Sequence, residues 1–219
     1  MVIPFLLAQD EPDSGSKMPE ITRKVSGQSL KVVAAGLRSL SGKTASAGWF
    51  ATSHYETPDG KGVPVALVAA TQEYGAHISH PGGTPYKIGA DGKAVFVSKA
   101  EGAGLPVTKP HEIVIPPRPM LRPTVLRETQ NWLEILASGS RSVMAGRTTA
   151  DNVMEAIGAR GAGDIRKTIS MVWNPPLKPS TIAARRRALT DKKTVGALDK
   201  PLVASGIMID SVTHRTGSE

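Results

Sequence analysis

The amino-acid sequence predicts an α+β fold, with a small, mostly antiparallel sheet, flanking helices and a protruding β-hairpin loop. Helical periodicity and β-type alternation occur in turn along the 219 residues, as they do in α+β domains. Between residues 76 and 110 the chain is rich in Gly and Pro and contains an Asp-Gly pair typical of hairpin tips. Aromatic residues make up only 4% of the sequence, which indicates that part of the chain is loop or arm.

The first 22 residues are expected to form an N-terminal arm and linker, and residues 23–219 a single domain. The opening stretch MVIPFLLAQDEP has an apolar run that stops at Asp10. It is too short to span a bilayer and lacks both a basic start and a small-residue cleavage site, so we expect no membrane segment and no secretion signal. An apolar arm on a polar chain suits contact with a neighbouring subunit, and Phe5 and Leu6 are its expected contact residues.

Three elements are predicted between the arm and residue 76. Apolar residues at helical spacing from Leu30 to Leu40 predict a helix that Gly42 stops. ASAGWFATSHY predicts a strand with a glycine interruption, and VPVALVAATQEYGA predicts a β-like start that continues as a helix to Gly75.

Residues 76–110 predict a long excursion that leaves the main sheet and rejoins it. HPGGTP is a cluster of turn residues, and YKIGADGKAVFVSK predicts a hairpin with Asp91 and Gly92 near its tip. The strand HEIVI and a proline-rich run follow.

The second half of the chain is mainly helical by its periodicity. A helix is predicted from Thr124 to about Ala137. A second helix is predicted after Thr148 or Thr149, either of which suits its N-cap. The glycines of GARGAG are unfavourable inside this second helix. A short basic helix is expected from Ser180 or Thr181, and a helical turn running into a strand ends the chain. The core positions of the first of these helices are expected to be Val125, Trp132, Leu133 and Leu136.

No group of residues suggests catalysis, so we expect no enzymatic activity and no cofactor. GLRSLSGKT has five residues where a phosphate-binding loop has four, and GARGAG has no preceding strand and no acidic residue about 20 positions later. His77 and His80 lack a nearby third metal ligand, and no serine lies in a nucleophile elbow. The chain has no cysteine, which excludes disulfides, thiolate metal sites and a cysteine nucleophile.

The formal net charge of +8 indicates either an acidic partner, such as nucleic acid or an acidic protein surface, or simply a soluble basic surface. The densest basic run is Arg185, Arg186 and Arg187. On a helix these side chains spread around most of the circumference. They suit contact with a DNA backbone, and equally ion pairs with an acidic neighbouring subunit.

The run IVIPPRPMLRPT contains four prolines and two arginines within twelve residues. Because proline fixes φ and extends the preceding residue, this run predicts a stiff bridge that sets the entry of the following helix. We expect Arg118 and Arg122 to point outward and the residues between them to supply apolar contact, which together form a rim that docks on another protein. An ordinary stiff connection also explains the prolines. The expected interface residues are Arg118, Pro119, Met120, Leu121 and Arg122.

The order of several motifs resembles the tail-completion and head–tail joining (neck) proteins of long-tailed bacteriophages, of the minor tail protein Z kind. ATQEYGA is followed by a variable loop, by IPPRPMLRPT and by a helix containing Trp132. GDIRKTI, LKPSTIAARR and KPLVASGIMIDSV then follow, so the similarity extends from about Gln72 to the C-terminus. Met120 stands where Phe is common in the family, and Ala204-Ser205 replaces its usual Asp-Thr.

The resemblance implies a non-enzymatic virion protein in the neck or tail, assembled in the host cytoplasm. It implies a homo-oligomeric ring, expected to be a hexamer, that completes the tail and joins it to the head. Its partners would be portal and adaptor proteins, tail-tube protein and double-stranded DNA passing transiently through the channel, with no membrane. The alternatives are a tail terminator that caps the tail tube and a free-standing, sequence-independent DNA-binding protein.

Overall fold

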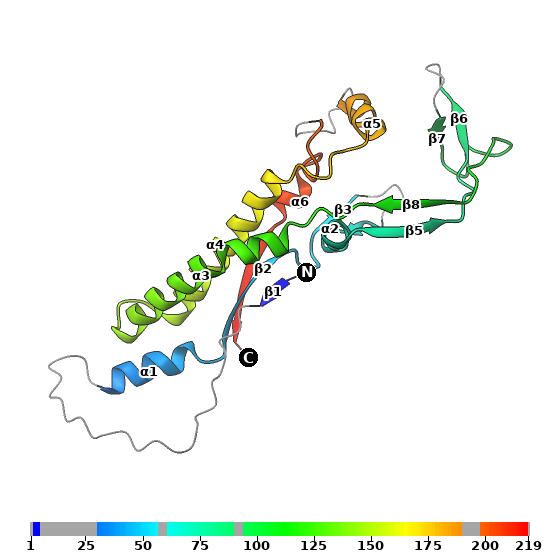
Figure 1. The fold of residues 1–219 in the computed structure, drawn as a ribbon. Helices are drawn as coiled ribbons and strands as arrows, with labels where there is room; N and C mark the ends of the chain where they lie inside the picture. Colours follow the sequence, from blue (N-terminus) through cyan, green and yellow to red (C-terminus); the bar gives the residue numbers. More distant parts are fainter. Residues whose placement is uncertain (1, 5–29, 57–60, 90–93, 190–197, 219) are drawn as a thin grey trace, which may run out of the picture. The chain divides into compact units, whose positions relative to one another are not determined.

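The computed structural model describes residues 2–4, 30–56, 61–89, 94–189 and 198–218 (Figure 1). Within these ranges the chain combines helices with small antiparallel sheets, which confirms the predicted α+β fold. The chain divides into two compact units: residues 1–69 together with 119–219, and residues 70–118. The excursion expected at residues 76–110 lies inside this second unit.

The first unit is built on a three-stranded antiparallel sheet with β2 (Lys43–Gly48) at its centre. β1 (Val2–Pro4) pairs along one side of β2, with Ile3 opposite Ala47. β9 (Thr213–Ser218) pairs along the other side, with Ala47 opposite His214. The sheet therefore joins the two ends of the described chain, as Figure 1 shows.

Helices surround this sheet in the first unit. α3 (Leu121–Met144) and α4 (Ala150–Met171) lie side by side, α4 also packs against β2 and β9, and α1 (Leu30–Leu40) packs against α3 (Figure 1). The remaining elements of this part of the chain are short: β3 (His54–Tyr55), β4 (Val63–Pro64), α5 (Pro179–Leu189) and α6 (Ile207–Asp210). α2 (Val65–Tyr74) begins in the first unit and ends in the second.

Two apolar clusters form the core of the first unit. The larger one joins the sheet, α4 and the start of α3, and contains Trp49, Met120, Leu121, Ile165 and Ile169, all at most 2% exposed. The indole of Trp49 donates a hydrogen bond to the Met208 carbonyl at 2.8 Å, which fixes α6 to the sheet. The smaller cluster lies where α1, α3 and α4 meet, around Leu40, Val143, Val153 and Ile157.

α4 approaches the sheet closely because of its glycines. A Cβ atom at Gly158 would lie 2.8 Å from the His214 ring, and one at Gly161 would lie 3.3 Å from the Ala47 side chain. The helix continues unbroken through GARGAG, although glycine has low helix propensity, because burial of the neighbouring apolar residues outweighs that cost. Thr149 is the N-cap, as predicted, and its side chain accepts a hydrogen bond from the Asn152 amide at 3.2 Å.

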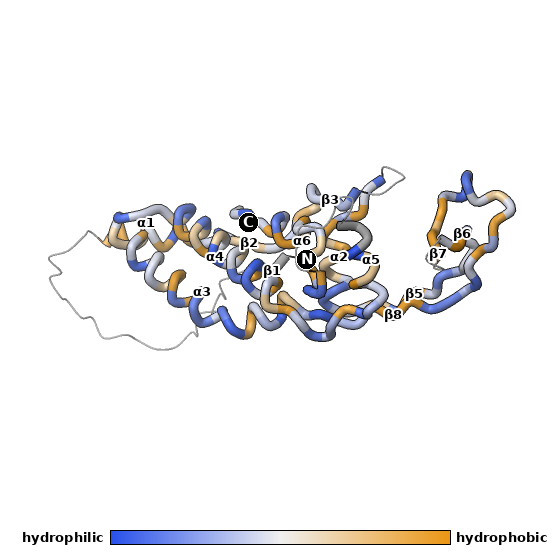
Figure 2. The backbone as a smooth tube through the Cα atoms, turned by 90° about the horizontal axis from the view of Figure 1, so that it is seen from above, coloured by the Kyte–Doolittle hydropathy of each residue, from blue (hydrophilic) through white to orange (hydrophobic). Residues whose placement is uncertain are grey.

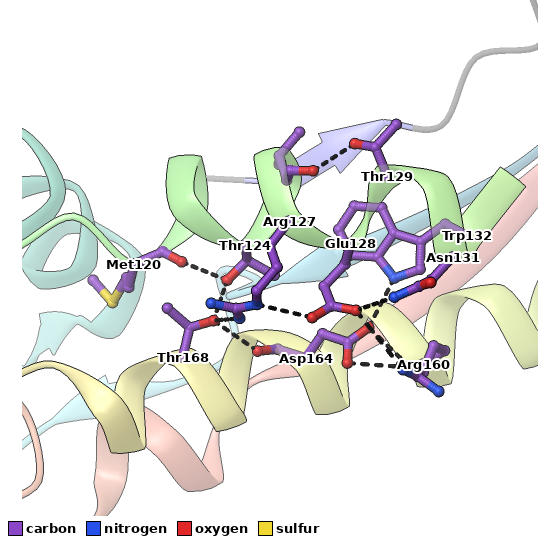
Figure 3. Close-up of polar contacts among 11 residues, drawn as sticks. Met120, Thr124, Arg127, Glu128, Thr129, Asn131, Trp132, Arg160, Asp164 and Thr168 are labelled. Atoms are coloured by element: carbon purple, nitrogen blue, oxygen red, sulfur yellow. Dashed lines mark hydrogen bonds and ion pairs between the residues drawn. The ribbon is translucent and has the colours of Figure 1, made fainter.

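A polar network joins α3 to α4 (Figure 3). Asp164 accepts hydrogen bonds from the Trp132 indole at 2.8 Å and from Arg160 at 3.0 Å, and Arg160 also lies 3.8 Å from Glu128. Further along, the Arg127 guanidinium donates to Thr168 at 2.7 Å. These contacts satisfy the buried carboxylates on both helices, as buried charges require.

The network explains why the expected core positions of α3 are only partly correct. Trp132 is buried, as expected, whereas Leu133 is 50% exposed. Thr124 and Glu128 occupy the α4-facing side instead, because their partners on α4 are polar and not apolar. In α1, similarly, Gly36 and Leu40 are the buried residues, and Leu30 and Leu37 are exposed.

The expected connection of the excursion to the main sheet is wrong. β5 (Ala76–His80) and β8 (His111–Ile115) pair with each other and with no other described strand. The ladder stops at the pair of Ala76 with Ile115, which Gly75 and the proline run flank. The predicted hairpin is confirmed as β6 (Tyr86–Ile88) paired with β7 (Ala94–Phe96). The predicted tip, Asp91-Gly92, lies outside the described residues.

Two glycines of α4 offer a matched test of helix-to-sheet packing. We expect Gly163→Ala to stabilise the protein by about 0.5–1 kcal/mol, because nothing lies within 4 Å of the added methyl group and alanine favours the helix. Gly158→Ala gains the same propensity but collides with His214, so we expect a net destabilisation of about 1–2 kcal/mol. Urea unfolding of both variants measures this; equal effects would contradict the packing.

The polar network predicts a dependence of stability on pH. Hydrogen bonds from Arg127 and Asn131, with the nearby Arg160 charge, lower the pKa of Glu128. Because the folded state holds the deprotonated form more tightly, Glu128 contributes stability above its unfolded pKa and loses it as pH falls through the lowered folded value. Glu128→Gln is therefore expected to lower stability at pH 7 and to weaken the loss between about pH 5 and pH 3. Thermal unfolding across this range tests it; an unchanged pH profile would contradict the assignment.

Candidate assembly interface

The ribbon formed by β5 and β8 is a two-stranded antiparallel structure with one mainly apolar face. Ile78 lies opposite Ile113, and Ala76 lies opposite Ile115, on one face. His80 and His111 continue this face, with their rings stacked at 4.9 Å between centroids. On the other face His77 lies opposite Val114, and Ser79 lies opposite Glu112. Because successive side chains of a strand point to opposite faces, the isoleucines gather on one face and most of the polar residues on the other, which makes the ribbon amphipathic.

This ribbon exposes its apolar side chains. Ile78 is 44% exposed and Val114 is 47% exposed. Beyond the ribbon, the β6–β7 hairpin exposes Ile88 and Phe96 by more than 60% each, and Val107 is also exposed. Figure 2 shows these apolar stretches in orange along the second unit. Among the described residues of this unit, no large apolar side chain is buried, so the unit lacks a hydrophobic core of its own.

The base of the ribbon is held by tight local contacts. Gly75 ends α2 with a φ of +76°, and a Cβ atom there would lie 2.8 Å from the Ile115 carbonyl oxygen. The Arg118 amide donates to the Gln72 carbonyl at 2.6 Å, and its guanidinium donates to the Gln72 side chain at 3.3 Å. The proline-rich segment therefore closes the ribbon against the end of α2.

The structure corrects the expected orientation of the proline run. Arg118 is only 7% exposed and does not point outward, and burial lowers the pKa of its guanidinium, which still remains charged at neutral pH. Met120 and Leu121 are buried in the core of the first unit and are not available to a partner. Arg122 is exposed and Pro119 is partly exposed. The prolines thus serve mainly to fix the chain's own geometry.

The basic helix also differs from a free DNA-binding surface. The Arg185 guanidinium donates to the backbone carbonyls of Leu198 and Lys200, at 3.2 and 2.5 Å, and so holds α5 to the following segment. Lys200 in turn lies 5.1 Å from the centre of the half-exposed Trp173 ring. Arg186 is exposed, and the side chain of Arg187 lies outside the described part of the structure.

The other expected features are as follows. Phe5 and Leu6 lie outside the described residues, and β1 just before them pairs with β2. In the described part of the chain no group of three His, Asp or Glu residues could hold a metal ion. No described helix has the length and hydropathy needed to cross a bilayer. The sequence predicted HEIVI as a strand but did not assign its partner AHISH, whose alternation of apolar and polar residues is the signal for the second strand of the ribbon.

Comparisons with known proteins yield no relative: no protein-family model, no curated protein and no solved structure matches this chain.

The two arginines of the proline run separate an internal role from a surface role. We expect Arg118→Ala to destabilise the second unit by roughly 1–3 kcal/mol, because it removes a buried donor from Gln72. Arg122→Ala changes an exposed residue and is expected to alter stability by less than about 0.5 kcal/mol. Limited proteolysis within residues 70–118 measures the first effect. Equal resistance of the two variants would contradict the internal role of Arg118.

Proposed function

We propose that this chain is a structural virion protein that forms a ring at the head–tail interface (neck) of a long-tailed bacteriophage. In this role it completes the tail and joins it to the head, and DNA passes through the ring. The observation that carries the proposal is the second unit, which exposes an apolar ribbon and hairpin and has no buried apolar core among its described residues. Exposed apolar surface of this kind is typical of a site that another protein contacts, and a two-stranded ribbon is only marginally stable alone.

The distribution of charge supports a protein partner for the second unit. Residues 70–118 contain five Lys and Arg against four Asp and Glu, a net charge of +1, which leaves +7 of the total +8 for the first unit. The second unit is nearly neutral and exposes apolar residues, which suits contact with a protein subunit. Nucleic acid, in contrast, is bound through concentrated positive charge. The basic first unit suits a position near DNA that passes without being held.

The partners follow from this role. Copies of the chain form a closed ring, which we propose to be a hexamer, because heterologous contacts between identical subunits either close or grow into filaments. Portal or adaptor proteins and tail-tube protein bind its two sides. The proposed location is the neck or tail of the virion, after assembly in the host cytoplasm, and the role requires no enzymatic chemistry.

Two other functions use parts of the same surface. A tail terminator would use the same exposed apolar residues of the second unit to cap the tail tube. A free-standing DNA-binding protein would instead rely on the basic first unit, and tight, steeply salt-dependent DNA binding by the monomer would favour it. The engagement of Arg185 with backbone carbonyls counts against that last alternative.

Virions assembled without this chain test the proposed role. Electron microscopy is expected to show filled heads and separate tails of normal length, because the joining ring is missing. Supplying the wild-type chain in trans should restore joined particles, whereas a chain with residues 76–115 replaced by a short Gly-Ser linker should not. Abnormally long tails would point to the terminator, and normal infectious particles would contradict a role in the virion.

A further inference from the structure

The β5–β8 ribbon has two outer edges that no other described strand covers. Each strand pairs only with the other, and both are exposed over most of their length. An uncovered strand edge presents a row of backbone N–H and C=O groups that readily pair with a strand of another chain.

The residues that normally prevent such pairing are missing from these two strands. Proteins protect free edges with Lys, Arg or Pro, and three other edge strands of this chain carry one of them: Pro4 in β1, Arg215 in β9 and Lys87 in β6. AHISH and HEIVI contain none of the three, and their single carboxylate is Glu112. β3 and β7 also lack Lys, Arg and Pro, but they are only two and three residues long, and such short strands are poor templates for pairing. Among the described strands, β5 and β8 are therefore the longest edges that contain none of these residues.

The two edges differ in sequence, which determines how copies can combine. Pairing β5 with β5 of a second copy, through a two-fold axis, would still leave both β8 edges open. Pairing β8 of one copy with β5 of the next leaves no edge open once the ring closes. Because all copies in a ring run in the same sense, this second arrangement alternates strand direction and gives a continuous antiparallel sheet.

We propose that neighbouring copies of this chain join edge to edge through the ribbon, β8 of each copy pairing with β5 of the next to form a closed β-belt. The inference rests on the proposed ring and specifies its contact. In the belt, the apolar side chains around Ile78 and Ile113 of all copies lie on one side of the sheet and contact one another across the new strand pairs. Backbone hydrogen bonds supply the affinity, and this face sets the register.

Single-cysteine chains test the pairing directly, because the natural chain has no cysteine. A tagged Ser79→Cys chain and an untagged Glu112→Cys chain are co-expressed, purified and oxidised mildly. The three possible disulfide-linked dimers are then separated by mass. His77→Cys provides a second position on the same face of β5, in case the inter-copy register is displaced.

The belt predicts that the mixed Ser79–Glu112 or His77–Glu112 disulfide clearly exceeds the half of all cross-links that random pairing would give. Predominant links between identical chains, or no cross-link at either β5 position in a protein that light scattering shows to be a ring, would overturn the inference and leave the ring intact. A wild-type protein that stays monomeric at high concentration would overturn the proposed ring as well.

A charge variant supplies an independent test that needs no oxidation. Ser79→Lys places on β5 the kind of residue that protects other edges, and it is expected to reduce the ring to monomers. Ala103→Lys adds the same charge at an exposed position outside the ribbon. It is expected to leave the mass of the ring, measured by light scattering, unchanged. Rings of equal mass from both variants would contradict edge pairing.

Discussion

A two-stranded ribbon cannot bury its own apolar face, and this constraint dominates the second unit. Ile78 and Ile113 lie side by side across β5 and β8, and no third strand or helix within the described part of that unit covers them. Ribbons of this size are marginal in water, so contacts at their base or with another chain must stabilise them. Gly75, Gln72 and Arg118 supply the contacts at the base. The apolar face and the two free edges remain for a partner.

The first unit has the opposite character. Its sheet is covered by α4, its core contains two tryptophans that are nearly inaccessible, and a polar network joins α3 to α4. Every buried carboxylate in that network has a charged or hydrogen-bonding partner, which holds the helices in one relative position. The first unit is thus held together by its own buried contacts, whereas the second unit exposes its apolar residues.

The sequence predicted helix ends and turns well where they depend on residues that are close together in the chain. Thr149 as an N-cap, Gly75 as the end of α2 and the β6–β7 hairpin are confirmed, because each depends on residues close together in the chain. The orientation of α3 was less predictable. Leu133 looked like a core residue by spacing alone, but the face toward α4 is set by polar partners more than 30 residues away.

The proline run shows the same limit for the candidate site. Its stiffness was readable, because proline restricts the backbone wherever it stands. Whether Arg118 and Met120 faced a partner or the chain's own interior depended on contacts with Gln72 and with the core, which the run does not encode. The strand HEIVI, in contrast, was predictable from its sequence, whereas its pairing with AHISH and the lack of a covering layer required the structure.

The most direct test asks whether the second unit needs a partner to be stable. It compares the amide hydrogen exchange of β5 and β8 between dilute monomer and assembled protein. We expect rapid exchange of both strands in the monomer and a slowing of roughly 100-fold or more on assembly, with α4 equally protected in both states. Strong protection of the two strands in the monomer, unchanged on assembly, would show that the ribbon is stable alone. That result would contradict its dependence on a partner.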